Sequence, residues 1–105
     1  MYNSFKKLTV LLLTLILSSC ASVRSTQELQ RGKMNFEAGY YREAFHQLLP
    51  LASEGNKEAQ YAVGYMYYYG YGVSLDTETG TFWIKKSADQ HYPQAMQALE
   101  AMRKS

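Results

Sequence analysis

Between residues 58 and 88, apolar and small residues recur at the spacing of two successive α-helices. Glycines at positions 70 and 72 separate the two patterns and are expected to supply the left-handed backbone that ends a helix. Asp76 is expected to cap the second helix by accepting hydrogen bonds from its first turn. The segment therefore predicts a helical hairpin. Its two apolar faces are Ala59, Ala62, Val63, Met66 and Tyr67, followed by Gly80, Trp83, Ile84, Ser87 and Ala88.

The flanking sequence predicts further helices of similar length. Ser25 and Glu28 have the spacing of a capping box, which indicates a helix start at Ser25. Asn56 is the expected cap of the third helix, and Pro93 suits the first turn of the last. Pro50 falls inside the second helix, where we expect a kink and not a break. The expected helices span residues 26–38, 41–54, 57–69, 77–90 and 93–105.

The hairpins repeat with an offset of 36 residues, as 80 − 44 and 95 − 59 both show. Two helices per unit and a period in the thirties are typical of helical solenoids. We therefore predict an all-α fold, a short α/α solenoid of about five antiparallel helices. Because no helix follows the last one in this sequence, we expect exposed apolar residues around Met96, Leu99 and Met102 that self-associate, as in a homodimer, or meet a partner. The aligned pairs are Ala44 with Gly80, Leu48 with Ile84, Ala52 with Ala88, Ala59 with Ala95 and Val63 with Leu99.

The central hairpin resembles the Sel1-like repeat, a relative of the tetratricopeptide repeat. Gly80 departs from the pattern, since alanine is usual there, and is expected to cost roughly 1 kcal/mol of helix stability. The resemblance implies a solenoid whose first helix in each unit lines a concave, protein-binding surface. The matching positions are Ala59-Gln60, Val63-Gly64, Met66-Tyr67, Gly70, Gly72-Val73, Asp76, Trp83 and Ala88.

The first 19 residues read as a signal peptide. Lys6 and Lys7 precede an almost unbroken apolar run over residues 8–17, which is too short to cross a bilayer of about 30 Å. The run ends in Leu-Ser-Ser-Cys at residues 17–20, which resembles the bacterial lipobox, so Cys20 is expected to carry the lipid. An ordinary signal peptide or an uncleaved anchor is the alternative. The expected organisation is a signal peptide (1–19), a lipidated tether (20–25) and a repeat domain (26–105).

The residues after Cys20 indicate where the protein is sorted. Ala21 and Ser22 follow the cysteine, and no aspartate stands there. By analogy with Gram-negative sorting, this favours a lipid-anchored envelope protein, in the outer membrane and facing the periplasm. Cys20 is also the only cysteine, and a lipidated thiol cannot form a disulfide, so none is expected.

Charge and side-chain chemistry exclude several functions. Removing Lys6 and Lys7 with the signal leaves 11 − 2 = 9 basic residues against 9 acidic ones, so the mature chain has no net charge and nucleic-acid binding is unsupported. His46 and His91 are isolated, without partners at metal-ligand spacing. No catalytic set can be assembled, so we expect no enzyme, no metal and no cofactor.

Tyrosine is the unusual component, with six of the ten tyrosines between residues 61 and 71. Tyr67 belongs to the core stripe. Tyr61, Tyr65, Tyr68 and Tyr69 form a second stripe on the opposite side of the helix, which is the expected partner-binding surface. Alternatively, these rings pack on adjacent helices and only their hydroxyls reach water. Met34 and Phe36 are expected to extend the surface.

The resulting functional hypothesis is a lipid-anchored scaffold or adaptor that binds an envelope protein or peptide through the concave tyrosine face. An alternative is a peptidoglycan- or glycan-binding protein, because aromatic rings stack on sugars. An envelope hydrolase is disfavoured, since no nucleophile is placed.

Overall fold

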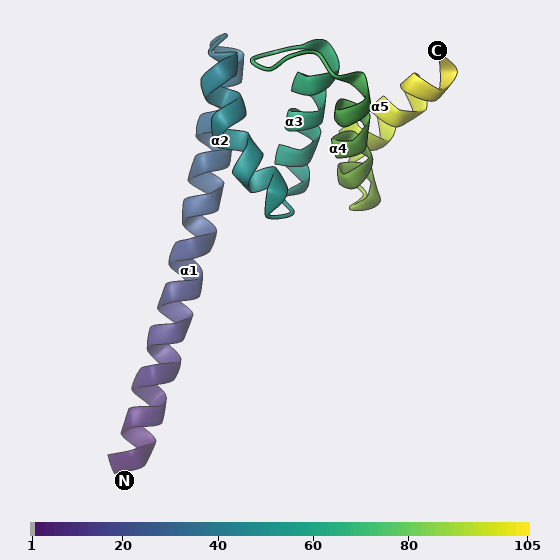
Figure 1. Ribbon diagram of the computed structural model, residues 1–105. Coiled ribbons are helices and arrows are strands. Elements are labelled where there is room, and N and C mark those ends of the chain that lie inside the picture. Colours follow the sequence, from purple (N-terminus) through teal and green to yellow (C-terminus); the bar gives the residue numbers. More distant parts are fainter. Residues whose placement is uncertain (1) are drawn as a thin grey trace.

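The computed structural model describes the backbone of residues 2–105 and the side chains of that range other than residues 2 and 14–21. This part of the chain is entirely helical apart from turns and one loop, which confirms the predicted all-α class (Figure 1). The helices are α1 (Tyr2–Glu37), α2 (Tyr41–Ser53), α3 (Lys57–Tyr69), α4 (Thr77–Asp89) and α5 (Pro93–Lys104).

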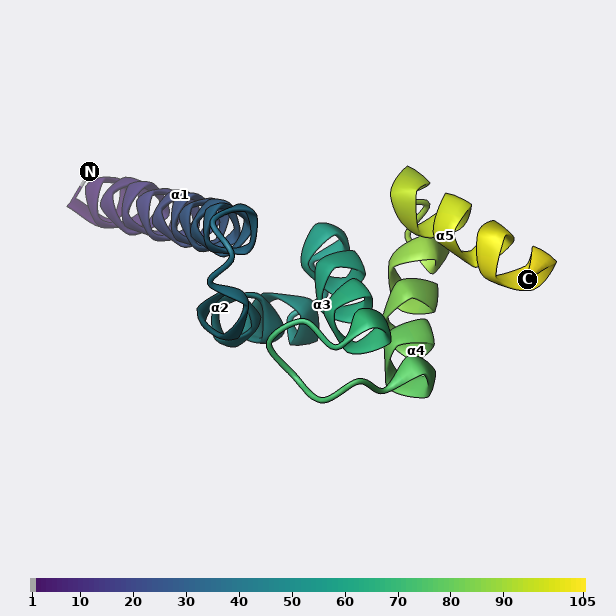
Figure 2. The same cartoon turned by 90° about the horizontal axis from the view of Figure 1, so that it is seen from above.

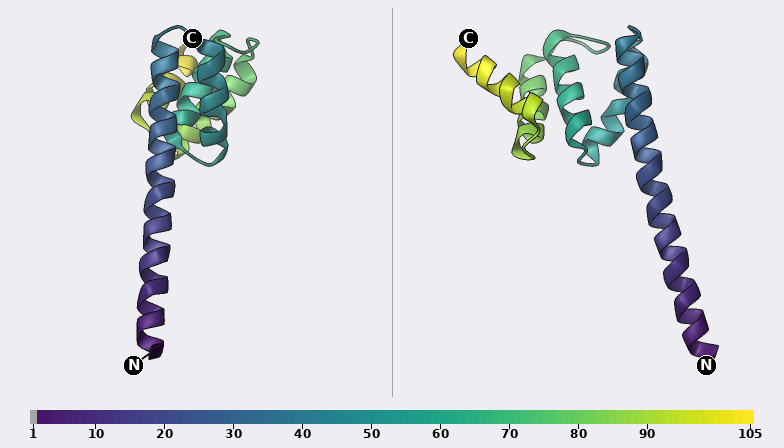
Figure 3. Two further views of the ribbon diagram at one scale, coloured as in Figure 1. Left: turned by 90° about the vertical axis from the view of Figure 1, so that its left-hand side faces the viewer. Right: turned by 180° about the vertical axis from the view of Figure 1, so that it is seen from behind.

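Each helix packs on the next one along the chain, as in an α/α solenoid. Seen from above, α1 and α5 lie on one side of the stack of helices, and α2 and α4 lie on the other side (Figure 2). Only the C-terminal part of α1 packs against α2. The N-terminal part of α1 extends away from the other helices as a long rod (Figure 3).

The predicted helix start at Ser25 is wrong, because α1 runs without interruption through this residue. Ser25 Oγ donates a hydrogen bond to the Ser22 carbonyl at 2.9 Å instead of capping a helix, and Thr26 Oγ1 donates to the same carbonyl. Serine and threonine make such bonds inside helices when the preceding turn is already formed. The predicted tether over residues 20–25 therefore has a helical backbone. Among the described residues, we find no helix with both the length and the apolar character needed to cross a membrane.

The boundaries of the other helices agree with prediction to within a residue or two. Asn56 caps α3, its side chain accepting a hydrogen bond from the Ala59 N–H at 2.9 Å, and Asp76 caps α4 in the same way. Gly70 and Gly72 have φ angles of +76° and +71°, as expected for residues that end a helix. Helix α2 continues through its proline, so the prediction that Pro50 does not break the helix is confirmed.

The core follows the predicted apolar stripes of α2, α3 and α4. Among the described side chains, two polar ones are also buried, and both have partners: Gln60 Nε2 donates to the Ala52 carbonyl at 3.2 Å, and Ser87 Oγ donates to the Lys57 carbonyl at 2.7 Å. These bonds avoid the cost of burying an unsatisfied polar group. The fully buried apolar residues include Ala44, Leu48, Ala59, Val63, Met66, Ile84 and Ala95, whereas Ala62 and Tyr67 are half-buried.

Helices α3 and α4 cross closely at two glycines. A Cβ atom on Gly80 would lie 2.7 Å from the Gly64 carbonyl oxygen and 2.7 Å from the Tyr68 nitrogen. A Cβ atom on Gly64 would lie 2.6 Å from a side-chain carbon of Ile84. Gly80 was expected only to weaken its helix; the structure shows that it also permits the backbones to approach.

The predicted apolar surface on α5 is confirmed for Met96, which is 49% exposed, whereas Leu99 and Met102 are half-buried. Self-association through this helix stays a prediction.

Candidate functional site

The predicted tyrosine stripe forms one connected row of rings on α3, which we call the tyrosine row (Tyr61, Tyr65, Tyr68 and Tyr69). The ring centroids of Tyr61 and Tyr65 lie 6.3 Å apart, those of Tyr65 and Tyr69 4.7 Å, and those of Tyr68 and Tyr69 5.1 Å. Tyr69 is 54% exposed and the other three are half-buried. The row therefore combines packed rings with accessible aromatic surface, which is the character of interface hot spots.

Rings from other elements join the row around Tyr65. Tyr71, in the loop after α3, stacks parallel to Tyr65 with an interplanar angle of 5° and a centroid distance of 6.0 Å. Phe36 of α1 meets Tyr65 edge-on at 6.0 Å, Tyr41 lies 4.8 Å from Tyr71, and Tyr92 lies 5.6 Å from Tyr61. The cluster thus ties three helices, the loop after α3 and the turn before α5 together.

Sequence reasoning found only part of this cluster. Phe36 was named as an extension and does join it, whereas Met34 is 59% exposed and lines none of the clefts described below. Tyr41, Tyr71 and Tyr92 were missed. Tyr71 could have been suspected from its place between the two loop glycines, but the other two come together only through the packing of different elements.

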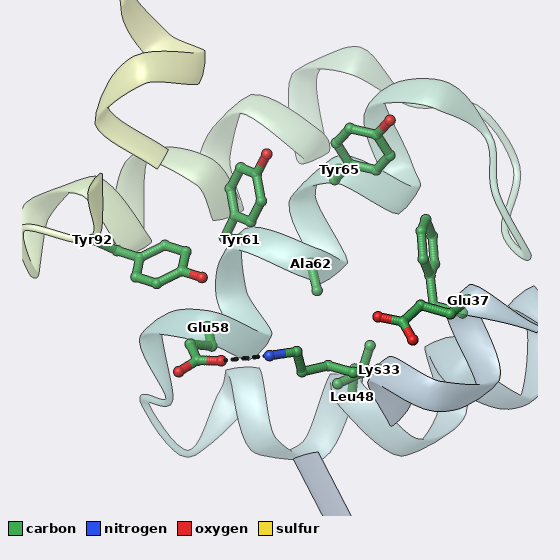
Figure 4. A pocket seen from close by; sticks show the side chains of 9 residues that line it. Lys33, Glu37, Leu48, Glu58, Tyr61, Ala62, Tyr65 and Tyr92 are labelled. Atoms are coloured by element: carbon green, nitrogen blue, oxygen red, sulfur yellow. Dashed lines mark hydrogen bonds and ion pairs between the residues drawn. The ribbon is translucent and has the colours of Figure 1, made fainter. Parts of the chain in front are cut away.

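The first cleft lies between α1, α3 and the turn before α5 and has a volume of about 280 Å³. Figure 4 shows the Lys33 side chain reaching across it toward Glu58, where Nζ and Oε2 lie 3.3 Å apart. Because both side chains are well exposed to solvent, this ion pair contributes little to stability. The lining residues are Lys33, Phe36, Glu37, Leu48, Glu58, Tyr61, Ala62, Tyr65 and Tyr92.

A second cleft of about 210 Å³ lies on the other side of the tyrosine row, against α4 and α5. Tyr61 and Tyr65 line both clefts, so the row stands between them as a ridge. The second cleft is lined by the whole row together with Ile84, Ala98, Ala101, Met102 and Ser105.

The phenol groups of Tyr61, Tyr65 and Tyr92 stay protonated at neutral pH. Burial raises the pKa of Tyr61 and Tyr65 above the ordinary value, and neighbouring tyrosines add to the effect. Burial also raises the pKa of Tyr92, with a further increase from Glu58 and a decrease from Lys33. These three residues therefore offer neutral aromatic rings with hydroxyl groups that can donate and accept hydrogen bonds.

The acidic and histidine residues considered as catalytic or metal-binding candidates make local contacts within the fold. Asp76 accepts hydrogen bonds from the Thr79 hydroxyl and N–H, which lower the pKa of its carboxyl group. His46 meets the edge of the Phe45 ring, and His91 occupies a turn with a φ angle of +62°. Within the described part of the chain, no group of three or more His, Cys, Asp or Glu residues is arranged to hold a metal ion. The side chain of Cys20, the predicted lipidation site, lies outside the described side chains.

Stacked antiparallel helices joined by short turns and one glycine loop define the chain as an α/α repeat protein. Residues 57–92 match the model of the Sel1 repeat. The structure is similar to the crystal structure of a Sel1 repeat protein from Oxalobacter formigenes, with a TM-score of 0.57 and 32% sequence identity. The similarity covers 59% of this chain and 18% of that protein. The predicted resemblance of the central hairpin to the Sel1 repeat is therefore confirmed. Sel1 repeats generally act as scaffolds for protein–protein interactions and are typically not enzymes.

Proposed function

We propose that this protein is a lipid-anchored scaffold of the bacterial envelope that binds a protein or peptide partner across the tyrosine row. The single observation that carries the proposal is the aromatic ridge between two clefts. Tyrosine provides large, stiff contact area with a polar tip, so a partner gains binding energy with little loss of side-chain entropy. An extended peptide or a partner helix that crosses the ridge would contact both clefts.

The anchor is the second part of the proposal, and it rests on the sequence. Cys20 follows the apolar run over residues 8–17 at the position that the lipobox requires for its cysteine. A diacylated cysteine holds a protein on a membrane more firmly than a single chain does. Mass spectrometry of the mature N-terminus should find lipid on Cys20, and Cys20→Ser should release the protein from the membrane fraction. A mature chain without lipid would refute the anchor and leave the binding surface unaffected.

Partner binding is tested with the full chain purified in an uncharged detergent and immobilised. Proteins of the solubilised envelope retained on the chain are identified and then re-bound in purified form. Tyr65→Ala combined with Tyr68→Ala should lose such a partner. Tyr40→Ala is the matched control, because Tyr40 is 62% exposed and lies outside the tyrosine row. Circular dichroism must first show that all variants are equally helical.

The outcomes separate the candidate surfaces. Loss in the double variant with retention in Tyr40→Ala supports the tyrosine row, and equal retention in both excludes it. The exposed ring of Tyr69 also suits a sugar. Sedimentation of the wild-type chain with purified sacculi, without any retained protein, would favour the peptidoglycan-binding alternative.

A further inference from the structure

The first cleft carries an excess of negative charge. Its three charged side chains are Lys33, Glu37 and Glu58, and the first and last of these pair with each other. Glu37 makes no side-chain hydrogen bond or ion pair with any described residue. Its carboxylate points into the cleft (Figure 4). One uncompensated negative charge therefore faces the space that an occupant would fill.

The position of Glu37 at the end of its helix strengthens this charge. Helix α1 ends at Glu37, and the C-terminal end of a helix carries a partial negative charge. The carboxylate and the helix end both favour a cation.

The walls and floor of the cleft suit a long cationic side chain. Tyr61, Tyr65 and Tyr92 present neutral rings, over which a guanidinium or ammonium group is attracted by the ring electrons. Phe36 and Ala62, which are both half-buried, provide an apolar surface for the aliphatic stem of such a side chain. At about 280 Å³, the cleft is slightly smaller than typical small-molecule sites of roughly 300–1,000 Å³. Its size fits one residue of a partner.

We propose that the first cleft binds an arginine or lysine side chain of the partner, with the carboxylate of Glu37 pairing with its cation and the tyrosine rings stacking against that cation. This inference rests on the proposed function, because it names the residue type that the tyrosine surface recognises. Arginine is favoured over lysine, since its planar group both stacks on aromatic rings and pairs with a carboxylate.

The test selects binders for the full chain, in uncharged detergent micelles, from a library of randomised seven-residue peptides. Selected peptides should share one basic position. Their affinities are then measured by fluorescence polarisation, along with those of versions carrying citrulline or norleucine at that position. Glu37→Gln should weaken the basic peptide by about 3- to 10-fold and leave the neutral version unchanged. Glu54→Gln is the matched control, because Glu54 is also exposed at a helix C-terminus but lines none of the described clefts.

A variant with the opposite expected effect on affinity distinguishes a role in recognition from a role in folding. Lys33→Gln removes the cation that neutralises Glu58, so it should tighten binding of the basic peptide. A purely structural role of this charge cluster would make both Lys33→Gln and Glu37→Gln bind more weakly, and that result would overturn the inference.

The remaining outcomes separate the inference from the proposed function. Peptides without a common basic position that still need Tyr65 and Tyr68 would refute the cationic site and leave the scaffold standing. Basic peptides that bind Glu37→Gln as well as the wild type would also refute the site. The absence of any selected peptide would overturn the inference and count against peptide recognition by the scaffold.

Discussion

The substitution Gly80→Ala tests the close crossing of α3 and α4. In an exposed helix this change stabilises by about 1 kcal/mol, because alanine is the better helix former. Here the new methyl group would lie 2.7 Å from the Gly64 carbonyl oxygen and 2.9 Å from the Tyr68 Cα. Both obstacles are backbone atoms, so no side-chain rotation can relieve the clash and the two helices must move apart.

The magnitude follows from setting the two effects against each other. Overpacking a tight contact costs roughly 1–3 kcal/mol. At the upper part of that range it outweighs the propensity gain, and we expect a net loss of about 1–2 kcal/mol. For a domain of this size, that loss lowers Tm by about 4–16 °C. Moving the helices apart would also expose Ile84, which is 1% exposed in the native packing.

Thermal unfolding followed by circular dichroism measures this change in the full chain. Lys85 is exposed on the same helix, so the difference between Lys85→Ala and Lys85→Gly measures helix propensity alone. If Gly80→Ala raised Tm by about that difference, the crossing would not be close and the reasoning would fail. Gly64→Ala should behave like Gly80→Ala, because its methyl group would meet Ile84 and the Gly80 carbonyl.

Three further changes probe two helix caps and one half-buried tyrosine. Asn56→Ala removes the bond to the Ala59 N–H and should cost about 1 kcal/mol, visible as a lower urea midpoint. Asp76→Ala should lower Tm at neutral pH. In the wild type, the pKa of Asp76 is lower in the folded state than in the unfolded chain, so the stability that Asp76 contributes is lost as the pH falls below about 4. The Asp76→Ala variant lacks this contribution and should therefore lose less stability in acid. Burial raises the pKa of Tyr65, so its contribution to stability is lost as pH rises above about 10, and Tyr65→Phe should reduce that alkaline loss.

The sequence was sufficient wherever the signal is local. Asn56 and Asp76 cap the helices that they were predicted to cap, because a cap depends only on the three or four residues that follow it. Gly70 has the predicted left-handed backbone for the same reason. The prediction at Ser25 was wrong because serine is found both at helix starts and inside helices, and the conformation of the preceding residues determines which of the two occurs. A local motif could not show that the helix was already formed.

Contacts between elements were predicted less well. The periodicity of α3 placed Tyr65 outside the core stripe, and Tyr65 is half-buried whereas Val63 and Met66 of that stripe are fully buried. The parallel stacking of Tyr65 on Tyr71 depends on how the glycine loop folds back, and the approach of Phe36 depends on the angle at which α1 meets α3. Gly80 also depends on a neighbouring element. From the sequence of its own helix, this glycine is expected only to lower helix stability, and only the closeness of Gly64 in the structure explains why a residue without a side chain is needed there.

The charge of the candidate site also depends on a contact between elements. A stripe of tyrosines on one helix predicts an apolar binding surface without any preference for charge. The proposed preference for a cation comes from α1, which ends beside that stripe and places Glu37 at the rim of the first cleft, while Lys33, one turn earlier, is paired with Glu58. Specificity is therefore expected to come from α1, the helix next to the tyrosine row. Substitutions at the end of α1 should change which peptides bind while leaving the aromatic surface of the tyrosine row intact.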